Sequence, residues 1–159
     1  MKIETALIGA AGEHLVLSRL LRRGILASQS PFNASRYDIL VNSKKDKTPV
    51  LIQVKTTSQN KSNWQMKPED ADNSDKNFYY CFVDLSSEPE RVYVIPSKKV
   101  SQVLIEADRV WMSKPRKDGS KKGEHKMRML KNKFILDIKS APDGWMDKYL
   151  EKWDVFIDE

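Results

Sequence analysis

The sequence predicts an α/β fold in which a mixed central sheet is flanked by helices. Three observations predict it: a helical repeat near the N-terminus, two pairs of strand-like runs, and a second helical run that follows them. Of the 159 residues, 40% are apolar and 31% are charged, a composition typical of folded globular proteins. A chain of this length can bury a core without disulfides or structural metal, so we expect one domain over residues 1–159.

Residues 3–23 form the first predicted helix. Apolar side chains recur there at steps of three and four residues, and Gly24 is a typical helix stop. Glu13 lies among small and apolar neighbours on one face of this helix. The stretch GAAG at residues 9–12 is not a phosphate-binding loop, because no Lys-Ser or Lys-Thr follows at the required spacing. Its small residues should instead let the helix approach the sheet closely.

Four apolar runs predict two hairpins. YDILVN at residues 37–42 reads as a strand, and VLIQVKTT at residues 50–57 follows it after the turn signal DKTP. NFYYCFVDL at residues 77–85 and RVYVIP at residues 91–96 form the second pair. Cys81, the single cysteine, lies in the third run, where we expect a small buried apolar side chain.

The segments between and after these hairpins give weaker signals. Residues 59–76 are polar and predict a long loop, whereas residues 97–112 predict a helix capped by Ser97. KFILDIK at residues 133–139 reads as a short strand. In the tail, aromatic residues at four-residue spacing predict an amphipathic helix docked on the core: Trp145, Tyr149 and Trp153.

Basic residues are concentrated in one segment, residues 113–133. It holds nine Lys or Arg and two acidic residues, a net charge of +7, whereas the whole chain carries +6. Such a segment favours a polyanion as partner, although a solvated loop kept extended by self-repulsion would have the same composition. The candidate polyanion-binding side chains are Lys114, Arg116, Lys117, Lys121, Lys122, Lys126 and Arg128.

Two polar residues interrupt the apolar strand at residues 50–57. Gln53 and Lys55 point to the same face because side chains two apart share a face of a strand. A solvent-facing stripe would look the same. However, the hairpin places Asp38 beside this pair, and Glu13 could close the cluster from the first helix.

The chemistry that such a cluster supports is phosphodiester hydrolysis. Mg²⁺, or Mn²⁺ in its place, takes oxygen ligands, which Asp38, Gln53 and Glu13 could supply together with water and substrate phosphate. Lys55 could orient the attacking water or offset the charge that builds on the phosphate.

The order of these motifs resembles the PD-(D/E)xK nuclease superfamily. The residues that carry the resemblance are Glu in GAAGEHL, Asp in RYDIL and Gln-x-Lys in IQVKTT; the Gln is similar to a variant found in some bacterial endonucleases. The resemblance implies a restriction-endonuclease-like fold, metal ligands at Glu13, Asp38 and Gln53, and a catalytic lysine at Lys55. Tyr37 stands where the motif usually has Pro, and Gln53 removes one negative charge from the metal site.

We therefore expect a Mg²⁺-dependent DNA endonuclease, with the basic segment on the phosphate backbone. A homodimer or larger assembly is expected, since cutting both strands of a symmetric duplex favours two active sites. The alternatives are a non-catalytic nucleic-acid-binding protein and a protein-interaction module, such as an inhibitor or immunity partner, that keeps the fold.

The expected setting is the reducing cytoplasm. One cysteine builds no disulfide framework, and Glu4 and Glu13 interrupt the N-terminal apolar stretch that a signal peptide would need. No apolar run approaches the length needed to span a membrane, so no membrane partner is expected.

Overall fold

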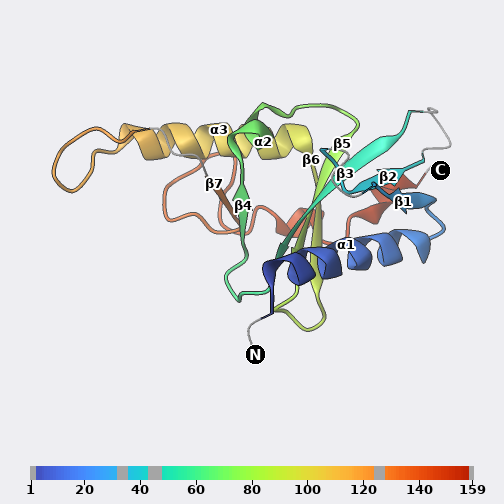
Figure 1. Cartoon of the computed structure of the whole chain (residues 1–159). Coiled ribbons are helices and arrows are strands. Elements are labelled where there is room, and N and C mark those ends of the chain that lie inside the picture. Colours follow the sequence, from blue (N-terminus) through green and yellow to red (C-terminus); the bar gives the residue numbers. More distant parts are fainter. Residues whose placement is uncertain (1–2, 32–35, 43–47, 124–127, 158–159) are drawn as a thin grey trace.

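Five strands form the central sheet of the computed structural model, which describes residues 3–31, 36–42, 48–123 and 128–157 (Figure 1). In sheet order they are β1 (Ala27–Gln29), β2 (Ile39–Val41), β3 (Val50–Thr57), β5 (Phe78–Asp84) and β6 (Arg91–Pro96). The β3 and β5 strands are parallel, whereas the other neighbours are antiparallel. Helices lie on both sides, so the predicted fold class, a mixed central sheet flanked by helices, is confirmed.

Helices α1 (Thr5–Leu21) and α3 (Ser97–Ser113) lie on opposite sides of the sheet (Figure 1). The short helix α2 (Pro68–Asp72) packs against α3. Successive side chains on the strands pack into two core clusters on opposite sides of the sheet. For example, Cys81 of β5 lies in the cluster on the α1 side, and Phe82 lies in the cluster on the α3 side. Cys81 is fully buried, as expected, and burial raises the pKa of its thiol.

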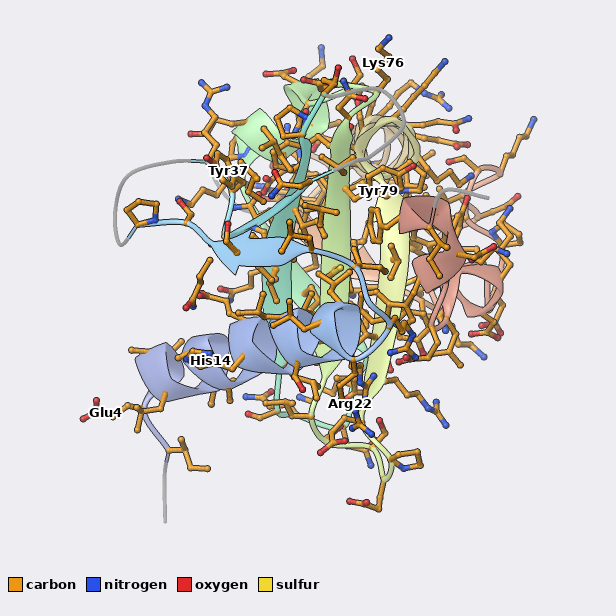
Figure 2. The ribbon with its side chains drawn as sticks, turned by 90° about the vertical axis from the view of Figure 1, so that its right-hand side faces the viewer. Glu4, His14, Arg22, Tyr37, Lys76 and Tyr79 are labelled. Carbon is orange, nitrogen blue, oxygen red and sulfur yellow. The ribbon has the colours of Figure 1, made fainter. Side chains whose placement is uncertain are left out.

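Helix α1 crosses the strands closely (Figure 2) because Gly12 has no side chain. A Cβ built at Gly12 would lie 1.9 Å from Thr56 Oγ1 on β3. A Cβ at Gly9, one turn earlier, would meet nothing within 4 Å. The expectation that the small residues of α1 permit close approach therefore holds at Gly12.

The prediction of a long loop at residues 59–76 is wrong. This segment forms β4 (Asn63–Met66) and α2, and β4 pairs antiparallel with β7 (Arg128–Lys131) in a separate two-stranded sheet. Trp64 and Met66 are buried against the α3 side of the core, and Trp64 Nε1 donates to the carbonyl of Val83 at 3.0 Å. Two alternating apolar side chains in a polar stretch are too weak a signal to indicate a strand.

The strand expected at residues 133–139 is not formed. Strand β7 comes earlier, inside the segment assigned to the basic run, because Leu130 is fully buried beside Trp64. The alternation in residues 133–139 is real: Phe134 and Leu136 pack against the core, whereas Ile135 is 95% exposed. In the described chain these residues form no ladder with a neighbouring strand.

The tail forms two short 3-10 helices, η1 (Asp147–Tyr149) and η2 (Trp153–Phe156), and not the predicted amphipathic helix. Glu151 lies between them with a φ of 52°, which interrupts any continuous helix. Both tryptophans are buried as expected, but Trp145 belongs to the α3-side cluster and Trp153 to the α1-side cluster. The tail therefore wraps around the edge of the sheet.

Ser97 begins α3 without capping it. Its hydroxyl donates to the carbonyl of Asp75 at 2.6 Å, and Pro96 occupies the position before the first turn. None of the helices in the described part of the chain is long and apolar enough to cross a bilayer.

Candidate functional site

The candidate site lies where β2 ends beside β3. The β2–β3 ladder stops at Ile39 and Ile52, while β3 continues with β5 as far as Thr57. Asp38 immediately precedes β2, and its backbone N–H donates to the Ile52 carbonyl at 2.8 Å. Its Oδ2 accepts from the Val54 N–H at 2.7 Å. The side-chain carboxylate of Asp38 thus accepts the hydrogen bond from Val54 where the β2–β3 ladder has ended.

Asp38 has a raised pKa. Partial burial is the main cause, and the negative charge of Glu13 acts in the same direction. The hydrogen bond from Val54 and the positive charge of Lys55 lower the pKa and offset part of this effect. The charges of both Glu13 and Lys55 therefore reach Asp38.

Glu13 lies on one side of the sheet, and Gln53 and Lys55 face the other side. Ile52 and Val54 face the α1-side cluster, so Gln53 and Lys55, which alternate with them, face α2 and α3. Glu13 is half-buried on α1, where its Oε2 accepts from Gln29 Nε2 at 3.1 Å. Glu13 therefore does not cover the face of Gln53 and Lys55, although its charge reaches Asp38.

Lys55 has a partner that the sequence did not indicate, Asp70 of α2. Lys55 Nζ lies 3.5 Å from Asp70 Oδ2, and both side chains are largely buried, at 16% and 9% exposed. Asp70 Oδ1 accepts from the Tyr80 hydroxyl at 2.9 Å, and Oδ2 accepts from the Lys67 N–H at 2.7 Å. The carboxylate is thereby fixed by three donors, and it holds the ammonium of Lys55 on the α2 side of the sheet.

A sequence signal for Asp70 did exist. Pro68 at the first helical position and an acid two residues later are typical of a helix start, and Asp70 does cap α2. The pairing with Lys55 depends on α2 folding back over the sheet, which no local pattern indicates. Burial and the nearby charge of Asp70 raise the pKa of Tyr80, so its hydroxyl stays a donor to Asp70.

Gln53 is half-buried beside this pair. Asp38 bonds to the residues on either side of Gln53, since its N–H donates to the Ile52 carbonyl and its carboxylate accepts from the Val54 N–H. Among the described residues the amide of Gln53 has no hydrogen-bonding partner, so its oxygen is available as a ligand. Tyr37, which stands where the motif usually has Pro, packs against the α3-side cluster and lies well apart from His14 of α1 (Figure 2).

Lys55 lines an open groove of about 550 Å³. The groove runs from the start of α1 across the end of β3 to the β4–β7 sheet. Its polar lining includes Lys55, Gln59, Lys61 and Gln65, and no acidic side chain is among the described residues that line it. The groove therefore offers cations and hydrogen-bonding groups to an anionic ligand.

The residues of the predicted basic segment fall into two groups. Beyond the end of α3 the chain loops out from the body of the molecule (Figure 1). Four cationic side chains are exposed there: Lys114, Arg116, Lys117 and Lys121.

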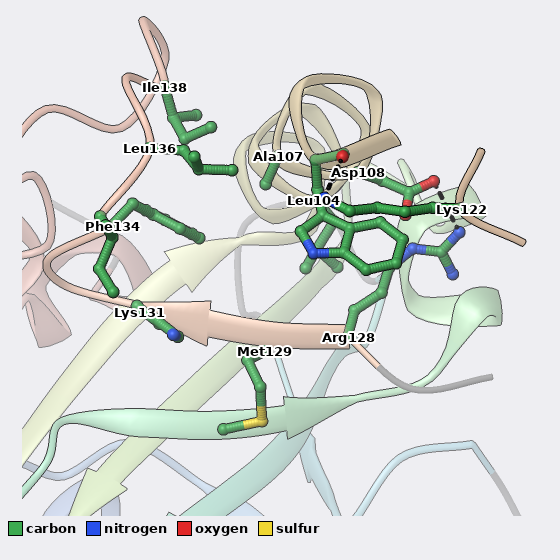
Figure 3. Close-up of a pocket in the computed structure, with 12 residues that line it drawn as sticks. Leu104, Ala107, Asp108, Lys122, Arg128, Met129, Lys131, Phe134, Leu136 and Ile138 are labelled. Atoms are coloured by element: carbon green, nitrogen blue, oxygen red, sulfur yellow. Dashed lines mark hydrogen bonds and ion pairs between the residues drawn. The ribbon is translucent and has the colours of Figure 1, made fainter. Parts of the chain in front are cut away.

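The other group packs against α3. Lys122 lies over the ring of Trp111, with Nζ 4.3 Å from the ring centroid and 3.0 Å from the Trp111 carbonyl. Arg128 Nη2 pairs with Asp108 at 3.2 Å across a pocket between α3, β7 and residues 134–138 (Figure 3). Lys126 lies outside the described residues. Four of the seven candidates are therefore exposed to a polyanion, and two already contact other described residues.

The residues predicted as metal ligands are Glu13, Asp38 and Gln53. Within the described residues, no group of three His, Cys, Asp or Glu is arranged to hold a metal ion. The charge of Glu13 reaches Asp38, whereas Gln53 faces the other side of the sheet from α1.

The sequence matches no protein-family model and no curated protein. Among solved structures, the chain is similar to I-Ssp6803I, a bacterial homing endonuclease. The match has 18% sequence identity and a TM-score of 0.50, and it covers 97% of this chain and 91% of that one. At this identity the likeness shows a shared fold.

Proposed function

We propose that this protein is a metal-dependent DNA endonuclease of the PD-(D/E)xK type that hydrolyses phosphodiester bonds. The observation that carries the proposal is Asp38, whose carboxylate accepts from Val54 of β3 beyond the end of the β2–β3 ladder and is reached by the charges of Glu13 and Lys55. Perturbed carboxyl groups beside a cationic groove are typical of functional sites. The fold shared with a bacterial homing endonuclease supports the same function.

The donor set fits Mg²⁺ or Mn²⁺. Both cations take oxygen ligands, and in this proposal Asp38 would be the main ligand, helped by Glu13 and by the amide of Gln53, which has no partner in the described chain. When bound, the cation would polarise the scissile phosphate and favour ionisation of the attacking water. With two carboxylates in the set, affinity in the absence of DNA should be weak.

Lys55 is the group that acts on the phosphate. Lys55 lines the groove and its ammonium is held by Asp70, so it would offset the charge that develops on the phosphate oxygens. The exposed cations beyond α3 would bind the DNA backbone on either side of the scissile bond. We further propose that two or more copies assemble on the duplex, so that each strand meets its own site.

A cleavage assay tests this function. Supercoiled, linear and branched DNA should be cut by the wild type with Mg²⁺ or Mn²⁺, and not by the Lys55→Ala or Asp38→Ala variants. Lys152→Ala, which removes an exposed lysine from the far tail, is the matched control and should cut normally. Fragment analysis on branched and linear duplexes, with the mass of the complex from light scattering, tests the assembly.

Titration calorimetry tests the metal site independently of cleavage. Gln53→Glu adds a carboxylate to the set and should tighten Mn²⁺ binding by about tenfold or more, because an ionised ligand attracts the cation. Asp38→Ala should abolish binding. Equal affinity in the wild type and Gln53→Glu would mean that this edge holds no metal.

A second candidate function is DNA binding without cleavage. The observation that favours it is Gln53 itself, a neutral residue where a metal site would gain from an acid. Such a protein would bind duplex DNA at moderate salt and leave it intact with either cation. A protein-interaction module, in contrast, would not bind DNA under those conditions.

A further inference from the structure

The β4–β7 sheet has one buried face and one open face. Trp64 and Leu130, directly opposite each other, are buried at 1% and 0% exposure and pack against the core. The next pair along the ladder is Gln65 opposite Met129, and both are exposed. The strand pair is therefore a ribbon with a dry inner face and an outer face that carries an amide next to a thioether.

The outer face of the ribbon continues the groove of the candidate site. Gln65 and Met129 line the same groove as Lys55 and Lys61. Among the described residues, the Gln65 amide has no hydrogen-bonding partner, so both its donor and its acceptor are available. A ligand whose phosphate reaches Lys55 would therefore extend over the ribbon.

The fold does not need these outer side chains. The ribbon is held to the body by Trp64, Met66 and Leu130, whose side chains are at most 1% exposed. Neither Gln65 nor the exposed part of Met129 contributes to that packing. Side chains that remain in contact with solvent on the outer face add little to the stability of the fold. Their chemistry is suited to contact with another molecule.

Duplex DNA is the partner that fits this surface. The major groove admits a two-stranded ribbon, and an amide side chain there pairs with the N6 and N7 edge of adenine, while an apolar side chain contacts the methyl group of thymine. The described lining of the groove at Lys55 contains lysines and no acids, which complements the flanking phosphates.

We propose that the β4–β7 ribbon reads base edges in the major groove, with Gln65 and Met129 as the specificity-determining residues. This inference rests on the proposed function, because it assumes that the groove at Lys55 receives DNA. It adds that the protein prefers certain base pairs at a fixed distance from the bond at Lys55, and that Lys61 contacts phosphate without regard to sequence.

Selection from random DNA tests the proposal with the full chain. Duplexes of about 30 base pairs with a random central region are incubated with the protein, and the bound and the cleaved fractions are sequenced. The wild type should enrich particular base pairs. Gln65→Ala should lose the preference at one or two adjacent positions and bind the enriched sequence about tenfold more weakly, while its affinity for unselected DNA changes less than about twofold.

Three further variants separate base reading from general binding. Met129→Ala should lose preference at a neighbouring position. Lys61→Ala should weaken binding to every sequence alike and leave the preferences unchanged. Gln102→Ala, which removes an exposed glutamine from α3, is the matched control and should behave as the wild type.

The ways in which these proposals can fail are distinguishable. If Gln65→Ala and Met129→Ala retain the wild-type preferences, or if the wild type cuts DNA with no preference at all, the ribbon does not read bases and the endonuclease proposal stands. If the wild type neither binds nor cuts any DNA, both proposals are overturned.

Discussion

At the scale of single residues, the environment of Asp38 works against its ionised form. Its pKa is raised mainly by burial and also by the charge of Glu13. Because the pKa of Asp38 is higher in the folded state, its neutral form stabilises the fold at pH values below the ordinary pKa of 3.8. This stabilisation is lost as the pH rises through the raised pKa of the folded state. The ionised carboxylate at neutral pH therefore costs stability, which is typical of a group kept for binding or catalysis.

Asp38→Asn should therefore stabilise the fold at pH 7, because the amide oxygen can still accept from Val54 without carrying a charge. The gain should shrink as the pH falls toward 3.5, where the wild-type carboxyl becomes neutral. Urea unfolding of both proteins at the two pH values measures the difference. A difference in unfolding free energy that does not change with pH would contradict the prediction.

Asp70 fixes the position of Lys55. Asp70→Asn keeps the volume and an acceptor for Tyr80 or Lys67 but removes the charge that pairs with a largely buried ammonium. We expect a loss of about 2–4 kcal/mol of stability and, at a temperature where the variant is folded, a kcat lower by about tenfold to a hundredfold with little change in DNA affinity.

The control for Asp70 lies on the same helix. Asp72→Asn changes an exposed carboxylate two residues away and should alter neither stability nor kcat. If Asp70→Asn lowers stability but leaves kcat unchanged, Asp70 only caps α2. The split between kcat and KM is therefore the decisive measurement.

At the scale of elements, the contact of α1 with β3 depends on Gly12. Gly12→Ala would place a methyl group 1.9 Å from Thr56 Oγ1 and 2.9 Å from its Cβ, so α1 must shift away from the strand. We expect a net loss of about 1–3 kcal/mol in spite of the better helix propensity of Ala. Gly9→Ala, which meets nothing within 4 Å, should instead stabilise by up to about 1 kcal/mol.

Thermal unfolding of the two alanine variants measures this contrast. Thr56→Ala removes the closest atoms, and its hydroxyl has no hydrogen-bonding partner in the described chain. Combined with Gly12→Ala, it should recover part of the lost stability. Equal melting temperatures for Gly9→Ala and Gly12→Ala would show that the helix does not depend on this approach.

Elements with strong periodicity can be predicted from the sequence, and those formed by distant pairing cannot. Helix α1 and strands β3, β5 and β6 carry long apolar patterns, so their types follow directly. Strand β4 has only Trp64 and Met66 as apolar signal, and its partner β7 lies far along the chain. That Asp38 lies near Gln53 and Lys55 is predictable because it precedes the strand that pairs with β3, whereas Asp70 reaches Lys55 only through the tertiary position of α2.

At the scale of the whole molecule, the loop beyond α3 extends away from the sheet (Figure 1) and holds exposed cationic side chains. If its exposed cations bind phosphates, DNA affinity should fall steeply with salt. Replacing Lys114, Lys117 and Lys121 with Ala should reduce the slope of log affinity against log salt by about 0.9 for each phosphate that the variant no longer neutralises.

A charge-matched control separates direct phosphate binding from the effect of net charge. Replacing the exposed lysines Lys98, Lys139 and Lys152 with Ala removes the same charge elsewhere and should leave the slope nearly unchanged. Fluorescence anisotropy with a labelled duplex over a range of salt concentrations measures both slopes. Equal slopes in the two triple variants would mean that the loop is only solvated.

The wrapping tail has a consequence for synthesis. Glu151 accepts hydrogen bonds from Arg19 of α1, from the backbone N–H of Val92 on β6 and from the indole of Trp153. Because domains are made from the N-terminus onward, Arg19 leaves the ribosome long before its partner exists. The first helix therefore cannot complete its contacts until nearly the whole chain has been translated. A nascent chain stalled before residue 151 should be cut by a protease at α1, and the released protein should resist it.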